Sequence, residues 1–293
     1  MKKLSIALLL TALLTASASA GDVLWFTGHS GFDEGHTNIQ TLLEAEGAVF
    51  DVVSAGSLPT LGDYTLIFIC MPGFLDPTDF SAAEKAALNS WLALGSHRVV
   101  MLGDWDGFYG GQDVMEDLLA AIGNPIVYQP GSWDGGCDHC SGPLGAADPL
   151  TSGLSHICYG LTATWNPAFG VALAYPEDAS APGPYIVGNG TDIPCIVGIG
   201  DSNVTTDLCD SHIGAAGDGD SMEFHRRLYQ ITCAGEEQLV CCIEERCTLL
   251  TEADCLATGG VFHPEYSSCS PNPCVGGTPV EPSTWGTIKT VFR

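Results

Sequence analysis

Acidic and aromatic side chains follow the apolar run at residues 99–102, where the chain continues as Gly-Asp-Trp-Asp-Gly-Phe-Tyr. Four consecutive apolar residues are too few for a helix and too continuous for a strand with one wet face. They therefore indicate a strand that is buried on both sides. Because ligands in open α/β sheets bind beyond the carboxyl ends of the strands, we expect chemistry at the turn that contains Asp104.

Two other apolar runs end in the same way. The run at residues 22–27 leads into Gly-His-Ser-Gly, which contains His29, and the run at residues 194–200 leads into Asp-Ser-Asn, which begins at Asp201. The carboxyl ends of parallel strands meet at one edge of a sheet, so the three turns are expected to lie together.

Two kinds of site would use the charged residues of these turns. A hydrolase would use His29 or Asp104 as a general base, with Asp201 as the third candidate catalytic group. A metal site would bind a hard cation such as Ca²⁺ through several oxygens. Its candidate ligands are Asp104, Asp106 and Asp201.

A third kind of site is a saccharide or polyol cleft, in which Trp105, Phe108 and Tyr109 would provide stacking faces. Aspartates after strands also commonly cap the next helix, so a structural role for the acids stays open beside these functions. The full set of candidate ligand-binding residues is Ser30, Asp104, Trp105, Asp106, Tyr109, Asp201 and Asn203.

Apolar runs alternate with helical patterns over most of the chain. The clearest helix start is Ser81-Ala-Ala-Glu84, a capping box in which two side chains satisfy free backbone N–H groups. Strands are expected at residues 22–27, 48–53, 64–70, 98–102, 169–174, 185–187 and 194–200. Helices are expected at residues 33–46, 81–95 and 115–122 and from residue 220 onward, whereas residues 128–155 read as a long loop.

This alternation predicts an α/β fold with a doubly wound, mostly parallel sheet and helices on both faces. The strands at Val23, Leu66 and Val100 are expected to be parallel neighbours.

The chain contains 13 cysteines, and residues 1–20 match a secretory signal with a basic start, an apolar stretch and an Ala-Ser-Ala end. An exported chain is expected to form disulfides. Seven cysteines precede residue 235, so one should stay unpaired, and Cys70 is the candidate because it ends an apolar strand. The cysteines expected in disulfides are Cys137, Cys140, Cys158, Cys195, Cys209, Cys233, Cys241, Cys242, Cys247, Cys255, Cys269 and Cys274.

Cysteines are densest after residue 240, where six fall within 34 residues. So short a segment cannot build a core of its own, and we expect three bridges formed only among these six to hold it together. The Cys137-Asp-His-Cys140 cluster could bind a metal. In an exported chain we expect Cys137 and Cys140 to form disulfides instead, with Cys158 and Cys209 as the candidate partners.

The composition is strongly acidic, with 35 acidic residues, 9 basic ones and a formal net charge of −26. A field of this sign repels nucleic acid and anionic membranes. No apolar stretch is long enough for a membrane span. We therefore expect an extracellular or cell-surface protein whose partners are proteins or saccharides of a cell surface.

Several motifs together resemble a known family. They are the strand at residues 64–70 followed by the capping box, the Leu-Gly-Asp104 turn, the loop Asp-Pro-Leu-Thr-Ser-Gly at 148–153, and Ile-Gly-Asp-Ser-Asn at 199–203. This order resembles secreted glutamine-amidotransferase-like domains of the trehalose-utilisation type. The resemblance implies a flavodoxin-like, amidotransferase-like sheet over residues 21–234. It also implies a nucleophilic cysteine at the position that Asp104 occupies, and the substitution argues against amidase chemistry.

The remaining segments complete the predicted organisation. Residues 235–276 resemble small cysteine-rich modules of secreted bacterial proteins, and residues 277–293 resemble a C-terminal sorting or attachment tail. We expect a non-catalytic binding or structural protein. The alternatives are an extracellular hydrolase acting through Asp104, His29 and Asp201, and a partner-binding protein that acts through its cysteine-rich module. No cofactor is expected, and calcium would be the ion if the acids form a metal site.

Overall fold

The computed structural model describes most of the chain between residues 22 and 274. The described residues are 22–54, 56–105, 107–124, 126–140, 144–145, 148–166, 170–189, 193–233, 239–243, 246–250, 255–256, 258–263, 266 and 273–274. The predicted signal segment, the C-terminal tail, Asp106 and Cys269 lie outside these residues.

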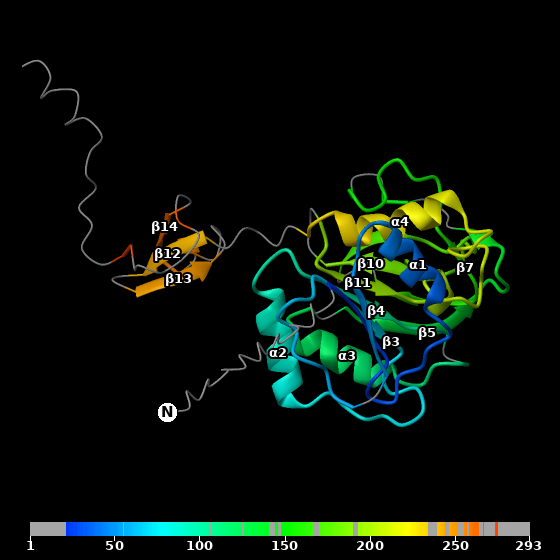
Figure 1. Ribbon diagram of the computed structural model, residues 1–293, viewed down its shortest axis with the longest axis horizontal. Helices are drawn as coiled ribbons and strands as arrows, with labels where there is room; N and C mark the ends of the chain where they lie inside the picture. The colour runs from blue at the N-terminus through cyan, green and yellow to red at the C-terminus, as the bar shows by residue number, and fades with distance from the viewer. Residues whose placement is uncertain are drawn as a thin grey trace, which may run out of the picture.

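A seven-stranded sheet with the order β2-β1-β3-β4-β11-β10-β9 forms the centre of the fold (Figure 1). Five strands pair in parallel, while β10 and β9 are antiparallel additions at one edge. The strands are β1 (Val23–Phe26), β2 (Phe50–Val53), β3 (Leu66–Cys70), β4 (Arg98–Leu102), β9 (Val171–Ala174), β10 (Ile186–Gly188) and β11 (Ile196–Ile199). The predicted mostly parallel sheet, with β1, β3 and β4 as neighbours, is confirmed.

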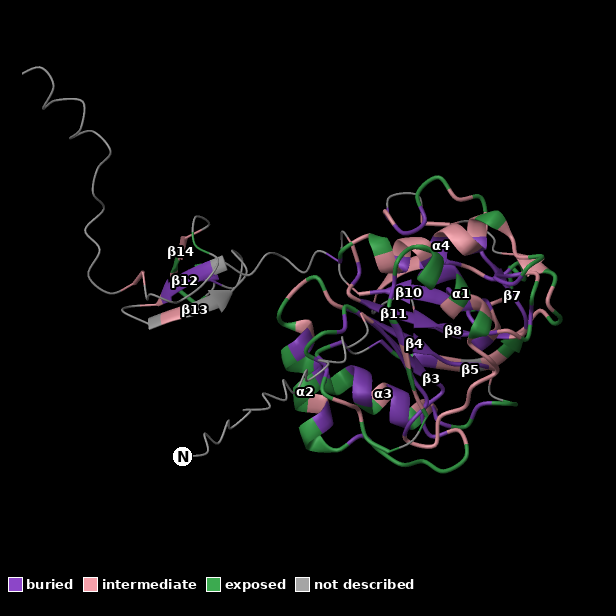
Figure 2. Ribbon diagram, in the orientation of Figure 1, coloured by how far each residue is buried: buried purple, intermediate pink, exposed green. Residues whose placement is uncertain are grey.

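Helices cover both faces of this sheet, because its central strands are apolar on both sides. Alternate residues of β1 point to opposite faces: Trp25 packs with α1 and α4, whereas Leu24 packs with α2 and α3. Figure 2 shows the strands as a continuous buried layer. The helices are α1 (Thr37–Ala45), α2 (Ala82–Leu92), α3 (Gln112–Ala121) and α4 (Gly219–Gln230).

The helix starts show what sequence could and could not predict. The capping box of Ser81 and Glu84 at α2 is confirmed. In contrast, α1 starts at Thr37, four residues later than expected, because the distant Asp207 carboxylate accepts the backbone N–H groups of Thr37 and Asn38 at 3.0 and 2.8 Å. At α4 the N-cap is Asp218, which lies two residues before the expected cap.

The prediction of a long loop at residues 128–155 was wrong. The segment contributes to two small antiparallel sheets, in which β5 (Tyr128–Trp133) pairs with β8 (Thr162–Trp165) and β6 (His139–Cys140) pairs with β7 (Cys158–Tyr159). β5 contains proline and glycine, and β6 and β7 have two residues each, so these strands lack the periodicity that identifies a strand.

Three antiparallel strands make a separate sheet in the cysteine-rich segment: β12 (Leu239–Ile243), β13 (Arg246–Leu250) and β14 (Val261–His263). Cys241 bonds to Cys255 and Cys242 bonds to Cys274. Cys247 is also in a disulfide. Both of the complete bridges stay within the segment, as predicted.

In the larger domain, the disulfides join Cys137 to Cys209, Cys140 to Cys158 and Cys195 to Cys233. The first two confirm the predicted partners. Cys70 is the free, buried cysteine among the described residues, which confirms the prediction of an unpaired thiol. No described helix combines the length and apolar character that crossing a membrane requires.

Candidate functional site

Asp104 lies directly after β4, at the carboxyl edge of the sheet, as the sequence predicted. It is 1% exposed, and both of its carboxyl oxygens take part in hydrogen bonds. Its own neighbour Trp105 donates a backbone N–H to Oδ1 at 2.7 Å, and the Ser202 hydroxyl lies 2.6 Å from Oδ2. Burial is the main reason that the pKa of Asp104 rises to about 7.

Ser202 connects Asp104 to a second acid. Its hydroxyl oxygen also lies within hydrogen-bonding distance of the Glu34 carboxylate, and burial raises the pKa of Glu34 as well. A serine hydroxyl has one proton to donate, so it cannot donate to both acids at once. One of the two carboxyl groups must therefore carry a proton and donate it to the serine oxygen.

Asp201 completes this acidic cluster, which consists of Glu34, Asp104 and Asp201. Asp201 is fully buried and caps a short 3₁₀ turn by accepting the Asn203 N–H at 2.9 Å, and it also accepts the Gly160 N–H. Burial, and next the negative charge of Asp104, raise its pKa well above the usual value. The prediction that the ends of β4 and β11 bring Asp104 and Asp201 together is thus met.

The structure places two of the three candidate metal ligands. Asp104 and Asp201 follow neighbouring strands, whereas Asp106 lies outside the described residues. Among the described His, Cys, Asp and Glu residues, the group whose ligand atoms all lie within 4.8 Å of one another is Cys140, His156 and Cys158. The two sulfurs of this group are joined to each other in a disulfide.

His29, in contrast, is directed to another partner. Its Nε2 lies 2.6 Å from Oε1 of Glu84, the capping-box acid of α2. Burial by itself would raise the pKa of Glu84, but hydrogen bonds from Ser81, His29 and the Leu58 backbone lower it to about 2. His29 thus pairs with a carboxylate outside the acidic cluster, and within the described part of the chain its ion pair is with Glu84 rather than with Asp104 or Asp201.

The turn after β1 holds an uncommon backbone conformation. His29 and Ser30 have φ angles of +53° and +54°, in the left-handed region that non-glycine residues seldom adopt. The turn after β3 holds them there, since the Gly73 and Leu75 N–H groups bond to the carbonyls of His29 and Ser30 at 2.8 and 3.3 Å. Neighbouring strand ends therefore support each other directly.

The aromatic candidates divide between the interior and the surface. Tyr109 is completely buried, and its hydroxyl lies 2.7 Å from the Pro72 carbonyl oxygen, so it is not available as a stacking face. Trp105 is half-buried and packs over Gly107. Phe108, which is 36% exposed, remains at the surface.

Phe108 belongs to a group that sequence reasoning missed, which we name the phenylalanine cluster. Its ring centroid lies 4.9 Å from that of Phe74 and 5.6 Å from that of Phe32, and the rings of Phe32 and Phe74 are stacked at 4.5 Å. All three rings are partly exposed. They come from the turns after β4, β3 and β1.

A repeated dipeptide in the sequence could have revealed this cluster. Each of these three strand ends is followed by Gly-Phe, at residues 31–32, 73–74 and 107–108. The three strands are neighbours in the sheet, so equivalent positions after them come together in space. The carboxyl edge of the sheet thus has buried acids and exposed aromatic rings.

Comparisons with known proteins find solved structures of low similarity. No family model matches the chain, and no curated protein matches it in sequence. One solved structure, a putative ThuA-like protein from Bacteroides uniformis, is 14% identical and matches with a TM-score of 0.42 over 71% of this chain and 89% of its own.

Two further structures match over similar lengths. PurLQS from Thermotoga maritima has a TM-score of 0.44 at 11% identity, over 72% of this chain and 98% of its own. A putative GMP synthase protein from Thermoplasma acidophilum has a TM-score of 0.39 at 8% identity, over 71% and 92%.

Proposed function

We propose that this chain is an exported, non-catalytic binding protein whose ligand lies on the phenylalanine cluster. The observation that carries the proposal is the convergence of three partly exposed rings, one from each of three adjacent strand ends, at the edge of the sheet where α/β domains bind ligands. Phe32 and Phe74 are partly buried against the core, and Phe108 lies over them at the surface. A contiguous apolar patch of this kind is a feature of binding sites.

The neighbouring reactive groups support binding without bond breaking. A nucleophile must reach its substrate, but Asp104 is 1% exposed and hydrogen-bonded at both oxygens. The free thiol of Cys70 is 2% exposed, and burial raises its pKa well above the usual value. A buried, protonated thiol is a poor nucleophile.

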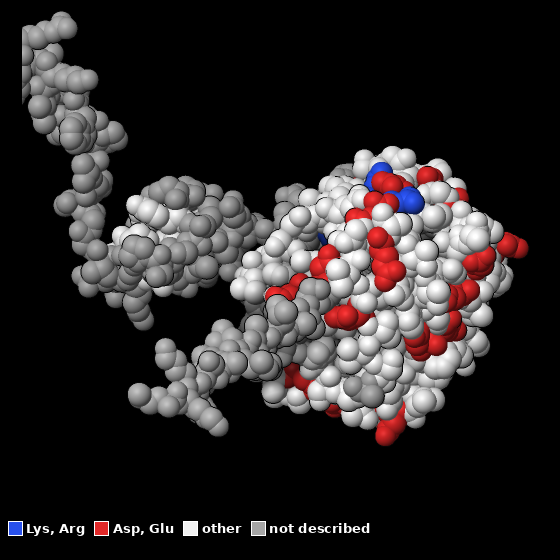
Figure 3. All heavy atoms as spheres, viewed as in Figure 1, with Lys and Arg blue, Asp and Glu red and all other residues white. Residues whose placement is uncertain are grey.

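Neutral saccharides are the ligand class that this edge suits best. A sugar ring presents a flat face of C–H groups that packs on aromatic rings, and it carries no charge for an acidic surface to repel. Acidic side chains are spread over the visible face in Figure 3, with few basic ones. Anionic ligands would be repelled by this field.

Export is supported by the disulfides of the larger domain and of the cysteine-rich segment, since such bonds persist in oxidising compartments. We assign the protein to the cell exterior or cell surface on this ground together with the signal-like residues 1–20. The test is to add protease to intact cells that produce the tagged protein. Digestion of the protein would support the assignment, and protection from the protease would contradict it.

The binding proposal is tested by calorimetry and affinity electrophoresis with a panel of neutral polysaccharides. We expect a ligand in this panel, and we expect Phe108→Ala to weaken its binding at least tenfold. Leu94→Ala is the matched control, because Leu94 is an apolar residue that is 71% exposed elsewhere on the domain. Equal binding by both variants, or no binding to any saccharide, would contradict the proposal.

A hydrolase remains the second candidate, because the pKa of Asp104 near 7 and the neighbouring Asp201 are features of acid–base pairs. We expect the protein not to hydrolyse amide, ester or glycoside substrates. Turnover that is lost in Asp104→Asn would favour the hydrolase and reject the non-catalytic assignment.

A further inference from the structure

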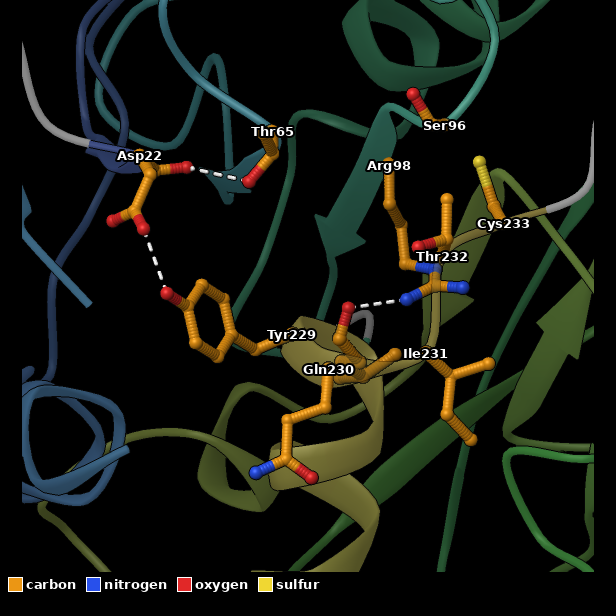
Figure 4. Close-up of a pocket in the computed structure, with 10 residues that line it drawn as sticks. Asp22, Thr65, Ser96, Arg98, Tyr229, Gln230, Ile231, Thr232 and Cys233 are labelled. Carbon is orange, nitrogen blue, oxygen red and sulfur yellow. Dashed lines mark hydrogen bonds between the residues drawn. The ribbon is translucent and has the colours of Figure 1, made fainter. Parts of the chain in front are cut away.

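The opposite end of the sheet has a cavity of about 460 Å³ (Figure 4). Its walls come from residues just before β1 and β3, from the first residue of β4, and from the end of α4 and the residues that follow it. The lining residues that matter below are Asp22, Thr65, Ser96, Arg98, Ile231 and Thr232. This volume lies within the range of small-molecule sites, roughly 300–1,000 Å³.

We propose that this cavity binds a small monocarboxylate through the guanidinium group of Arg98. The site is independent of the phenylalanine cluster, which lies at the other edge of the sheet.

Arg98 is a buried cation that lacks a full set of partners. It is 2% exposed, its Nε donates to the Pro194 carbonyl at 2.9 Å, and its Nη1 donates to the Leu228 carbonyl at the end of α4. Its Nη2 is buried and has no hydrogen-bond partner among the residues that the structure describes. In Figure 4 this nitrogen points away from the carbonyl that its neighbour binds.

The charge of Arg98 is balanced only at a distance. Arg226 and Arg227 form ion pairs with Glu46 and Glu223. The carboxylate that acts electrostatically on Arg98 is that of Asp148. Burial lowers the pKa of Arg98 to about 10, so the group remains charged at neutral pH. A buried donor without an acceptor is unfavourable, and a carboxylate oxygen would form a charge-assisted hydrogen bond with it.

The remaining wall groups define the rest of the ligand. Ser96 and Thr232 offer hydroxyl groups, while Leu228 and Ile231 are apolar. The Thr65 hydroxyl already donates to the Asp22 carbonyl at 3.1 Å. The Asp22 carboxylate is already bound by the Val49 N–H and the Tyr229 hydroxyl, each at 2.6 Å. A second negative charge on the ligand would meet Asp22 without a new cation, so one carboxylate on a small neutral body fits best.

Benzoate and its neutral analogue benzyl alcohol are the test probes, measured by calorimetry and thermal unfolding at constant ionic strength. We expect saturable benzoate binding, with benzyl alcohol and chloride at least tenfold weaker. Arg98→Lys keeps a charge but removes the planar fork, and it should weaken benzoate binding at least tenfold. Arg226→Lys, an arginine on α4 outside the cavity, should leave binding unchanged.

Thr232→Trp provides a second variant that leaves Arg98 intact. Thr232 is exposed at the mouth of the cavity, and an indole there should exclude benzoate. If Arg98→Lys fails to fold, the Thr232→Trp result decides. Equal binding of benzoate and benzyl alcohol, an equal response to chloride, or full benzoate binding in either variant would overturn the proposal.

Discussion

The two ends of the central sheet bury charge in opposite ways. At the carboxyl edge, three acids lie close together without a basic partner in their hydrogen-bond network, and raised pKa values show that they tend to take up protons. At the amino edge, Arg98 cannot lose its proton under ordinary conditions, so it is solvated by backbone carbonyls instead. A buried acid can become neutral by taking up a proton, whereas a buried arginine stays charged and needs hydrogen-bond acceptors.

Loss of Asp201 should have the largest effect. Asp201→Leu would leave the Gly160 and Asn203 N–H groups without acceptors in a buried site, and we expect it to lower the free energy of unfolding by roughly 4 kcal/mol. The Asp201→Asn variant keeps one acceptor oxygen, and its free energy of unfolding should fall by about half as much. Urea unfolding measures both, with the exposed Asp178→Asn as control. Equal losses for Leu and Asn would mean that the N–H groups do not depend on these oxygens.

At the amino edge, Arg98→Met should be less damaging. The variant leaves the Pro194 and Leu228 carbonyls without this donor but also removes a buried charge, and we expect a loss of roughly 2 kcal/mol in the same assay. If the loss exceeded that of Asp201→Leu, the order of the two edges would be reversed.

The protonation argument predicts how stability depends on pH. The pKa of Asp104 is about 7 in the folded state against 3.8 ordinarily, so the folded state holds this proton more tightly. Its stabilising contribution is complete below pH 3.8 and is lost as the pH rises through 7. Between pH 6 and 8 the wild type should therefore lose roughly 1 kcal/mol more unfolding free energy than Asp104→Asn.

Three histidines act in the opposite direction and must be subtracted, because burial lowers the pKa values of His97, His212 and His225. His225 is fully buried, and burial lowers its pKa from 6.5 to about 4, so it destabilises the folded state as the pH falls below 6.5. The histidines are present in both proteins, so the difference between them removes the histidine contribution and leaves that of Asp104 and of the acids coupled to it. Parallel pH profiles for the wild type and Asp104→Asn would mean that Asp104 is not protonated near neutrality.

The last prediction concerns how accessible the Cys70 thiol is to a labelling reagent. Its thiol is buried and its pKa is raised, so a thiol reagent should label it only as fast as the protein opens. Labelling followed by peptide mass spectrometry would measure this rate, and Cys70→Ala would identify the peptide. Rapid labelling of the native protein would show a thiol that is accessible at the carboxyl edge.

The sequence predicted the features that depend on neighbouring residues. Buried strands read as continuous apolar runs, the Ser81–Glu84 capping box lies within one helical turn, and the odd number of cysteines pointed to Cys70. The start of α1 could not be predicted this way, because its cap, Asp207, is 170 residues from Thr37. Neither could the partner of His29, since Glu84 lies 55 residues away.

The candidate site was predicted in part. The proximity of Asp104 and Asp201 follows from strand ends that meet at one edge, but the burial of Tyr109 and the direction of His29 depend on side-chain packing. The three Gly-Phe pairs in the sequence indicated the phenylalanine cluster. They were missed because each strand was read separately, and the repeat is seen only when the three strand ends are compared. Its meaning depends on the order of strands in the sheet.

The disulfide between Cys195 and Cys233 has a mechanical consequence. Cys233 follows α4 and precedes the cysteine-rich segment along the chain, while Cys195 stands just before β11, which lies between β4 and β10 in the sheet. Tension applied from the C-terminal side would reach Cys233 first and pass through the covalent bridge to β11. The load would then fall on a strand that is hydrogen-bonded on both sides, and α4 would be shielded from being peeled off the domain.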